Sequence, residues 1–155
     1  MEINTGQHNE VSIFFSKGDE WCTGTSCETY GREHTSYNKT RVTTLTGILS
    51  PYREKNPDFY NWNRVRAKYC DGASFMGDTV YFPNQTTVTR AGMRIFNVMM
   101  EDLMMRGLGN ADNAVLAGGS AGGLAAMLHC DRFRESIPDV KRVKCISDSG
   151  FFLAG

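Results

Sequence analysis

The spacing of apolar and polar positions predicts buried strands that alternate with helices. Four short apolar or alternating runs have the length and composition of strands: residues 11–15, 64–70, 113–117 and 143–147. Two stretches with helix-forming composition follow the second and third of these runs: residues 89–106 and 124–129. Strands that alternate with helices are typical of a mostly parallel sheet flanked by helices, so the pattern predicts the α/β class.

The longer predicted helix has apolar residues at three- and four-residue steps, which indicates one buried face. Thr89 is the expected N-cap and Gly107 the expected stop. The predicted face consists of Ala91, Ile95, Val98, Met99 and Leu103. In contrast, residues 23–63 are rich in Thr, Ser, Tyr, Asn and Gly, and we expect them to form long surface excursions.

Length and charge limit the class of protein. The 155 residues suit one domain, residues 1–155, and the 17 Lys and Arg balance the 17 Asp and Glu. Neutrality argues against the basic surface that nucleic acid needs, and no window holds the roughly 18 apolar residues of a membrane span. We therefore expect neither nucleic acid nor membrane as a partner. The polar amino terminus also lacks the apolar stretch of a secretory signal.

Cysteines and glycosylation sequons favour an extracellular protein all the same. The close pairs Cys22/Cys27 and Cys130/Cys145 are candidates for two local disulfides, with buried free thiols as the alternative, and Cys70 is left over. No Cys-x-x-Cys pair occurs, so neither a zinc site nor any other metal site is expected. The sequons place candidate glycans on the side chains of Asn38 and Asn84.

The chemical signature of the chain is a Gly-x-Ser-x-Gly motif centred on Ser120. Its predicted context, a strand before and a helix after, is what a serine on a sharp strand-to-helix turn requires. Gly118, Gly119, Gly122 and Gly123 make up the expected turn, the nucleophile elbow. No phosphate-binding glycine fingerprint fits this segment, so a nucleotide loop is not expected. The motif predicts a serine nucleophile.

A serine nucleophile also needs an oxyanion hole and a base. The backbone N–H of Ala121, at the amino terminus of the following helix, is the expected oxyanion donor. His129 lies nine residues after Ser120 on the same predicted helix, roughly 13 Å along the axis, too far to take its proton. His8 and His34 precede the serine in polar stretches. Where a serine nucleophile occupies such a strand-to-helix turn, the acid and the histidine of its catalytic triad follow it in the sequence. The chain therefore does not supply its own triad in that order.

Ordered, aromatic-rich blocks from about Gly18 to Leu153 resemble the plant pectin acetylesterases, relatives of the animal enzyme Notum. The matching blocks are Trp-Cys at 21–22 with Cys27, Gly-Ile-Leu-Ser at 47–50, Asn-Pro-Asp-Phe-Tyr-Asn-Trp-Asn at 56–63, Tyr-Cys-Asp-Gly-Ala-Ser-Phe at 69–75, Asn-Ala-Val-Leu at 113–116, Gly-Ser-Ala-Gly-Gly at 119–123, Leu-His-Cys-Asp at 128–131 and Ser-Asp-Ser-Gly-Phe-Phe at 147–152. The Leu-His-Cys-Asp block looks like the plant enzymes rather than Notum.

The resemblance implies an α/β-hydrolase fold, here a partial domain that lacks amino- and carboxyl-terminal parts. It implies a carboxylesterase that removes acetyl groups from cell-wall pectin, with Ser120 as nucleophile, no cofactor, secretion to the cell wall, and a monomer when complete. The family's catalytic Asp and His are expected beyond residue 155. Asp148 matches a different family block, so we expect it to shape the pocket or cap a turn rather than act as the triad acid.

The oxyanion loop departs from the family pattern. Glycines precede Trp-Cys in the family, whereas Asp19 and Glu20 precede Trp21 here. Backbone N–H groups near Glu20 and Trp21 can still serve as oxyanion donors, but the Glu20 side chain opposes a forming anion. Two other interpretations stay open. The chain is a catalytically inactive fragment or polysaccharide-binding relic, with aromatic residues such as Tyr60 and Trp62 on its surface, or a Notum-like lipid-ester hydrolase.

Overall fold

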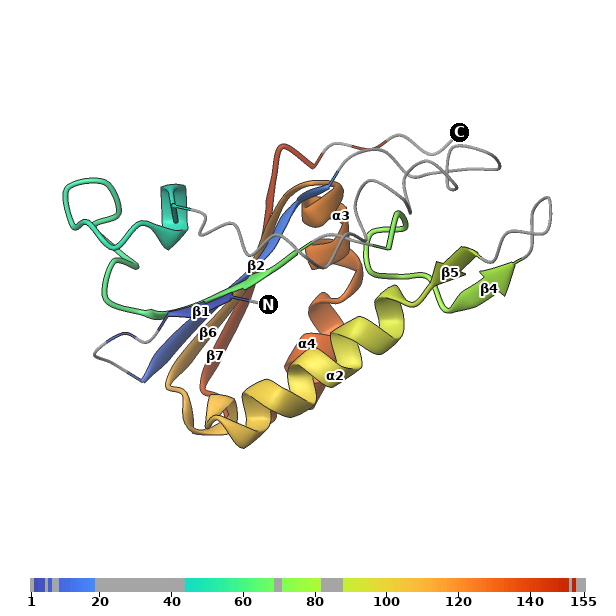
Figure 1. Cartoon of the computed structure of the whole chain (residues 1–155). Helices are drawn as coiled ribbons and strands as arrows, with labels where there is room; N and C mark the ends of the chain where they lie inside the picture. The colour runs from blue at the N-terminus through green and yellow to red at the C-terminus, as the bar shows by residue number, and fades with distance from the viewer. Residues whose placement is uncertain are drawn as a thin grey trace.

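The computed structural model describes residues 2–4, 6, 9–18, 44–68, 71–81, 88–150 and 152. Within these residues a five-stranded sheet forms the centre of the molecule, with strand order β1-β3-β2-β6-β7 (Figure 1). Its strands are β1 (Glu2–Asn4), β2 (Glu10–Gly18), β3 (Asn63–Ala67), β6 (Asn113–Ser120) and β7 (Arg142–Asp148). A separate two-stranded sheet pairs β4 (Thr79–Tyr81) with β5 (Val88–Arg90).

The sheet is mostly parallel, as the sequence predicts. Strands β3, β2, β6 and β7 run in one direction, and within this sheet the described antiparallel strand is the short edge strand β1. The four predicted strand segments coincide with these parallel strands, although β2, β6 and β7 extend beyond the predicted limits. Parallel strands place all their carboxyl ends at one edge, so β2 and β6 end side by side, with Gly18 opposite Ser120.

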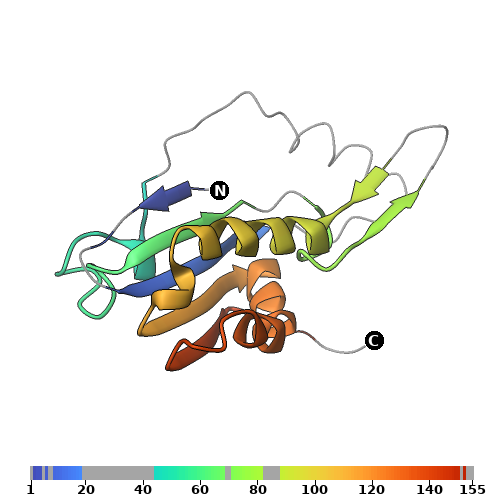
Figure 2. The ribbon, with the colours of Figure 1, turned by 90° about the horizontal axis from the view of Figure 1, so that it is seen from below.

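Three helices cover one face of the sheet: α2 (Gly92–Met105), α3 (Ala121–Leu128) and α4 (Cys130–Ser136) (Figures 1 and 2). The core lies between them and the strands, where Ile13 and Phe15 of β2, Val65 of β3 and Leu116 of β6 are buried. No helix in the described part of the chain is long and apolar enough to cross a membrane.

Helix α2 differs from its prediction in start and orientation. Thr89 is not its N-cap, because it pairs with Val80 in the β4–β5 sheet, and Ala91 precedes the helix instead. The face is also rotated, since Val98 is 63% exposed. The buried residues of α2 are Gly92, Phe96, Met99, Met100 and Leu103. Gly107 ends the helix as expected, with φ of 98°, and the short 3-10 helix η3 (Leu108–Asn110) follows it.

The segment 44–62 lies on the other side of the sheet from α3 and includes the 3-10 helix η1 (Gly47–Leu49) (Figure 1). The prediction of purely surface structure is wrong here, because Leu49, Ser50 and Asn56 are buried. The Asn56 amide nitrogen donates to the carbonyl oxygens of Ile48 and Ser50, and its amide oxygen accepts from the backbone N–H of Phe59. One buried asparagine therefore organises this apparently irregular segment.

A disulfide joins Cys130, the first residue of α4, to Cys145 in the middle of β7. This is one of the two local pairs expected from sequence. The bridge closes a loop with a sequence separation of 15 residues. It ties the junction between α3 and α4 to the edge strand of the described sheet.

Replacing both Cys130 and Cys145 with alanine should lower the free energy of unfolding by about 3 kcal/mol, because a bridge closing a loop of this length restricts the unfolded chain. Urea unfolding of the wild type and the double variant measures the difference. The double variant keeps Cys22, Cys27 and Cys70, so it separates this bridge from any other thiol chemistry. Peptide mapping that finds both thiols free in the native protein would contradict the assignment.

Candidate nucleophile elbow

Ser120 occupies the turn between β6 and α3 with an unusual backbone conformation. It is the last residue of β6 and the N-cap of α3, with φ of 54° and ψ of −121°. A side chain rarely adopts such positive φ, and positions of this kind are kept by their surroundings and concentrate at functional sites. The sequence motif and the backbone geometry therefore single out the same residue.

Close approach of two backbones explains the glycines around this turn. A Cβ atom on Gly118 would lie 2.0 Å from the carbonyl oxygen of Gly122, and one on Gly123 would lie 2.7 Å from the Ser147 hydroxyl. Gly119 is different, because its nearest neighbours would be Phe14 Cζ at 3.8 Å and the Asp148 carbonyl oxygen at 4.0 Å. Gly118 and Gly123 are thus required by space, whereas Gly119 is not.

Ala121 is the first residue of α3 and is buried. Backbone N–H groups in the first turn of a helix have no partner within the helix, so this end of α3 can accept negative charge. The second side of an oxyanion hole is expected just after Gly18, the strand partner of Ser120. The residues expected there, Glu20 and Trp21, lie outside the described residues. So do the remaining candidates Cys22, Cys27, Cys70, Asn38 and Asn84 and the histidines His8 and His34.

His129 lies in the core, where it follows α3 and precedes α4, and is 1% exposed. Its Nε2 atom is 2.8 Å from the carbonyl oxygen of Phe75, and its ring stacks on Phe96 with centroids 4.1 Å apart. Burial lowers the pKa of the imidazole, so the neutral form is favoured. His129 is therefore committed to a structural contact.

Asp148, the last residue of β7, lies opposite Gly119 in the strand register and is exposed. Its Oδ1 atom accepts a hydrogen bond from the Ser149 hydroxyl at 3.1 Å, and Ser149 has a φ of 54°. The carboxylate thus supports the turn that follows β7. The nearby Ser147 hydroxyl is buried against Gly123 and Gly150, without a hydrogen-bond partner among the residues that the structure describes.

The turn from Asp71 to Phe75 is a feature that the sequence pattern does not single out as functional. Asp71 is buried, and its Oδ1 atom accepts from the backbone N–H of Phe75 at 3.1 Å. Burial raises the pKa of this carboxyl group, against the effect of nearby backbone N–H groups and Arg90. Ser74 and Phe75 have φ of 48° and 57°. In the sequence, this turn is marked only by an acid, a glycine and an aromatic residue close together, within the block at 69–75.

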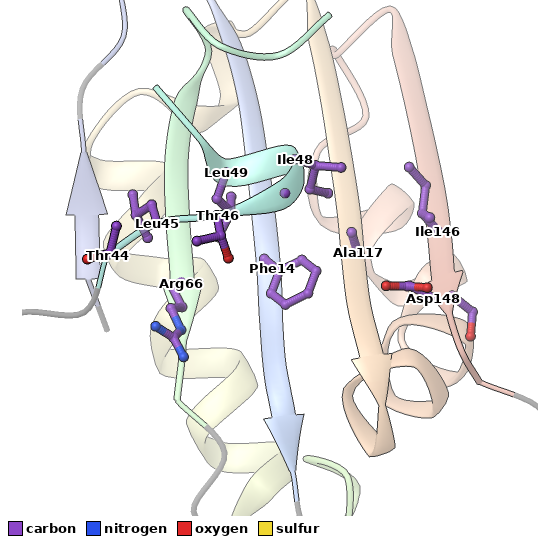
Figure 3. A pocket seen from close by; sticks show the side chains of 12 residues that line it. Phe14, Thr44, Leu45, Thr46, Ile48, Leu49, Arg66, Ala117, Ile146 and Asp148 are labelled. Carbon is purple, nitrogen blue, oxygen red and sulfur yellow. The ribbon is translucent and has the colours of Figure 1, made fainter. Parts of the chain in front are cut away.

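A hollow of about 580 Å³ lies on the sheet face opposite α3, under η1 (Figure 3). Its lining combines the apolar Phe14, Ile48 and Ile146 with the charged Arg66 and Asp148. Ser120 is not among its lining residues. Among the residues that the structure describes, no three His, Cys, Asp or Glu side chains gather as a metal site.

The glycine contacts predict a sharp difference between neighbouring substitutions. Gly118→Ala should lower the free energy of unfolding by about 3 kcal/mol or more, because its methyl group overlaps the Gly122 carbonyl. Gly119→Ala, the matched control one residue away, should cost less than about 1 kcal/mol, because its methyl group meets ordinary contact distances. Denaturant unfolding of the two variants makes the comparison, and equal effects would contradict the proximity of β6 and α3.

Comparison with known proteins agrees with this geometry. The family model described as "Pectinacetylesterase" matches residues 3–155. Pectin acetylesterase 11 of Arabidopsis thaliana is 40% identical over 148 residues, which cover 92% of this chain and 37% of that protein. Human palmitoleoyl-protein carboxylesterase NOTUM is 33% identical over 130 residues, 81% of this chain and 26% of that protein.

The solved structure of the Wnt deacylase Notum from Drosophila is similar over 97% of this chain and 47% of its own, with a TM-score of 0.82 and 27% identity. The predicted α/β-hydrolase fold is thereby confirmed. Two pectin acetylesterases match 92% of this chain. The chain spans about two fifths of the length of these relatives. With the family model extending over nearly all of its residues, the chain belongs to the pectinacetylesterase family.

Proposed function

We propose that this chain carries the nucleophile of a carboxylesterase that removes acetyl groups from pectin, with Ser120 as that nucleophile. The observation that carries the proposal is the backbone of Ser120, held at φ of 54° and ψ of −121° between β6 and α3. Such a turn exposes a serine hydroxyl at the carboxyl edge of the sheet, where acyl transfer is performed in α/β-hydrolases.

The proposed reaction proceeds through an acetyl-enzyme. The Ser120 oxygen forms a bond to the acetyl carbonyl carbon as its proton passes to a histidine base. The carbonyl oxygen becomes an anion that the N–H of Ala121 and the backbone near Glu20 and Trp21 stabilise. The bond to the sugar oxygen then breaks, and this oxygen takes the proton. Water attacks the acetyl-enzyme in the same way and releases acetate and free Ser120.

The base and its carboxylate are proposed to come from the part of the family's domain that this chain does not span. His129 does not fit the role, because its Nε2 is engaged by the Phe75 carbonyl and its ring is buried. In α/β-hydrolases the catalytic acid and histidine follow the serine in sequence. The region that this chain matches is 37% of the length of each of two pectin acetylesterases, so most of their length lies outside it.

An acetylated polysaccharide is the favoured substrate over a lipid ester. The pectin acetylesterases of Arabidopsis are 38–45% identical to this chain, whereas the palmitoleoyl-protein carboxylesterases are 31–36% identical. Secretion to the cell wall is part of the proposal. The Cys130–Cys145 disulfide supports it, because structural disulfides persist mainly in oxidising compartments.

A fluorophosphonate probe tests the nucleophile directly. The test uses the protein that carries the whole family domain, and with it the proposed base. We expect the probe to add once to this protein and to map to the peptide that contains Ser120, and Ser120→Ala to abolish the addition. Probe that still adds to Ser120→Ala, or a wild-type protein with the whole domain that stays unlabelled, would contradict a reactive serine. The second result would favour a catalytically inactive relic.

Substrate preference is tested on the protein that carries the whole family domain, by acetate release from acetylated pectin and by p-nitrophenyl esters of increasing acyl length. We expect turnover of acetyl esters to exceed that of octanoyl and longer esters by at least about tenfold, and to vanish in Ser120→Ala. A preference for long acyl chains would overturn the pectin assignment in favour of a lipid ester.

Backbone strain at Ser120 predicts that a glycine at this position gives a more stable protein than an alanine. Glycine adopts positive φ freely, whereas any other residue there costs roughly 1–3 kcal/mol. Ser120→Gly should therefore unfold with a free energy about 1 kcal/mol higher than Ser120→Ala, after the extra freedom of glycine in the unfolded chain is subtracted. Both variants lack the hydroxyl, so each controls for the other in denaturant unfolding. A less stable glycine variant would contradict the strain.

A further inference from the structure

Helix α3 holds the Ser120 turn at one end and has only eight residues. A helix this short is not stable by itself, so contacts at its two ends decide its position. At the first end the contacts are those of Gly118 with Gly122 and of Gly123 with Ser147. At the other end, His129 caps the helix, and its backbone N–H donates to the Ala125 carbonyl at 2.9 Å.

The His129 side chain links α3 to three other parts of the core. Its Nε2 must be the donor to Phe75, because a carbonyl oxygen only accepts. Its ring stacks on Phe96 of α2 with an interplanar angle of 12°, and it meets Phe15 of β2 with centroids 6.1 Å apart. The charged groups that act on it are Asp71, which raises its pKa, and Arg132 of α4, which lowers it.

The acceptor of this hydrogen bond belongs to a turn that has little freedom. Asp71 receives the Phe75 N–H, and the Phe75 ring stacks on Phe15 with centroids 4.6 Å apart. A Cβ atom on Gly92 would lie 2.0 Å from Asp71 Oδ2 and 2.4 Å from Phe75 Cα, so the turn is also pressed against the start of α2. The Phe75 carbonyl is therefore a fixed anchor.

We infer that His129 is a positioning residue that keeps the Ser120 turn in its strained conformation by anchoring the far end of α3 to the Phe75 carbonyl. The inference rests on the proposed function for its catalytic meaning. Its structural content is independent, because it concerns how firmly α3 is held. His129 donates the side-chain hydrogen bond and joins the helix to α2 and β2 through ring contacts.

The anchor depends on pH in a definite direction. The folded protein lowers the pKa of His129 below its ordinary value of 6.5, so the unfolded chain binds the proton more readily. The stabilising contribution is therefore present above pH 6.5 and is lost as the pH falls through the lowered pKa. Asp71 acts with the opposite sign, since its raised pKa favours the folded state most at acid pH.

Two substitutions separate the hydrogen bond from packing and titration. His129→Gln keeps an N–H donor near the Nε2 position and cannot be protonated. His129→Phe keeps the stacked ring and removes the donor. The matched control is Val140→Ala, at a fully buried core residue whose backbone hydrogen bonds join it to Ile137 and Arg134, and which should lower stability in general.

The main measurement is amide hydrogen exchange of the full chain from pH 5 to 8, with rates corrected for the intrinsic pH dependence. The reporters are the amides of Leu124 and Ala125, whose helical acceptors are the carbonyls of Ser120 and Ala121, and the reference is Leu116 in β6. We expect His129→Phe to lower the protection of the reporters relative to Leu116 by about fivefold to tenfold, the scale of one neutral hydrogen bond. Wild-type protection should fall below pH 6.5, and His129→Gln should retain protection without that fall.

An unchanged ratio in His129→Phe, or the same ratio change in Val140→Ala, would overturn the inference. A fall below pH 6.5 that persists in His129→Gln would also overturn it. The rate of fluorophosphonate addition to Ser120 is measured in parallel in the protein that carries the whole family domain, and it should follow the exchange ratio. If the wild type takes no probe while the exchange results hold, the proposed function fails and the anchor stands.

Discussion

The contact between the backbones of Gly118 and Gly122 is the constraint on which this structure depends. No side chain separates strand β6 from helix α3 at this point, since even a methyl group on Gly118 would lie 2.0 Å from the Gly122 carbonyl oxygen. The chain must therefore reverse direction within one residue, and Ser120 takes the positive φ that the reversal requires. The absence of side chains on the glycines allows the close approach, and Ser120 adopts the strained backbone conformation.

The rest of the core keeps α3 in that position. Phe15 of β2 contacts both Phe75 and His129, so the strand next to β6 is connected to the far end of the helix. The Cys130–Cys145 bridge fixes the residue after His129 to β7, on the other side of β6. A short helix is thus held between two strands by a covalent bond, a hydrogen bond and stacked rings, none of which lies at the serine itself.

Local patterns were enough to predict some of this arrangement and not the rest. The strand before Ser120 and the glycines around it are neighbours in sequence, so their pattern predicts the elbow directly. Thr89 has the right side chain for an N-cap, but its pairing with Val80 puts it in a strand that the local pattern does not reveal. The His129–Phe75 hydrogen bond spans 54 residues, and nothing near His129 in sequence indicates its partner. Residues 44–62 look like surface because the buried role of Asn56 depends on backbone carbonyls, which leave no pattern of apolar side chains.

Backbone strain occurs at both ends of helix α3, at the sheet edge where the proposed chemistry takes place and in the turn that holds His129. The positive-φ residues other than glycine in the described part of the chain are Ser74, Phe75, Ser120 and Ser149. Ser120 ends β6 and Ser149 follows β7, whereas Ser74 and Phe75 belong to the turn that contacts His129 at the other end of α3. Each such residue costs of the order of 1–3 kcal/mol, so four of them take up a large part of the net stability of a small domain. A domain can keep them only if the residues around each one are fixed by other contacts. The Asp71 carboxylate fixes Phe75, the Gly118–Gly122 contact fixes Ser120, and Asp148 bonds Ser149. A buried carboxylate, a close backbone contact and an exposed carboxylate thus hold three of the strained positions.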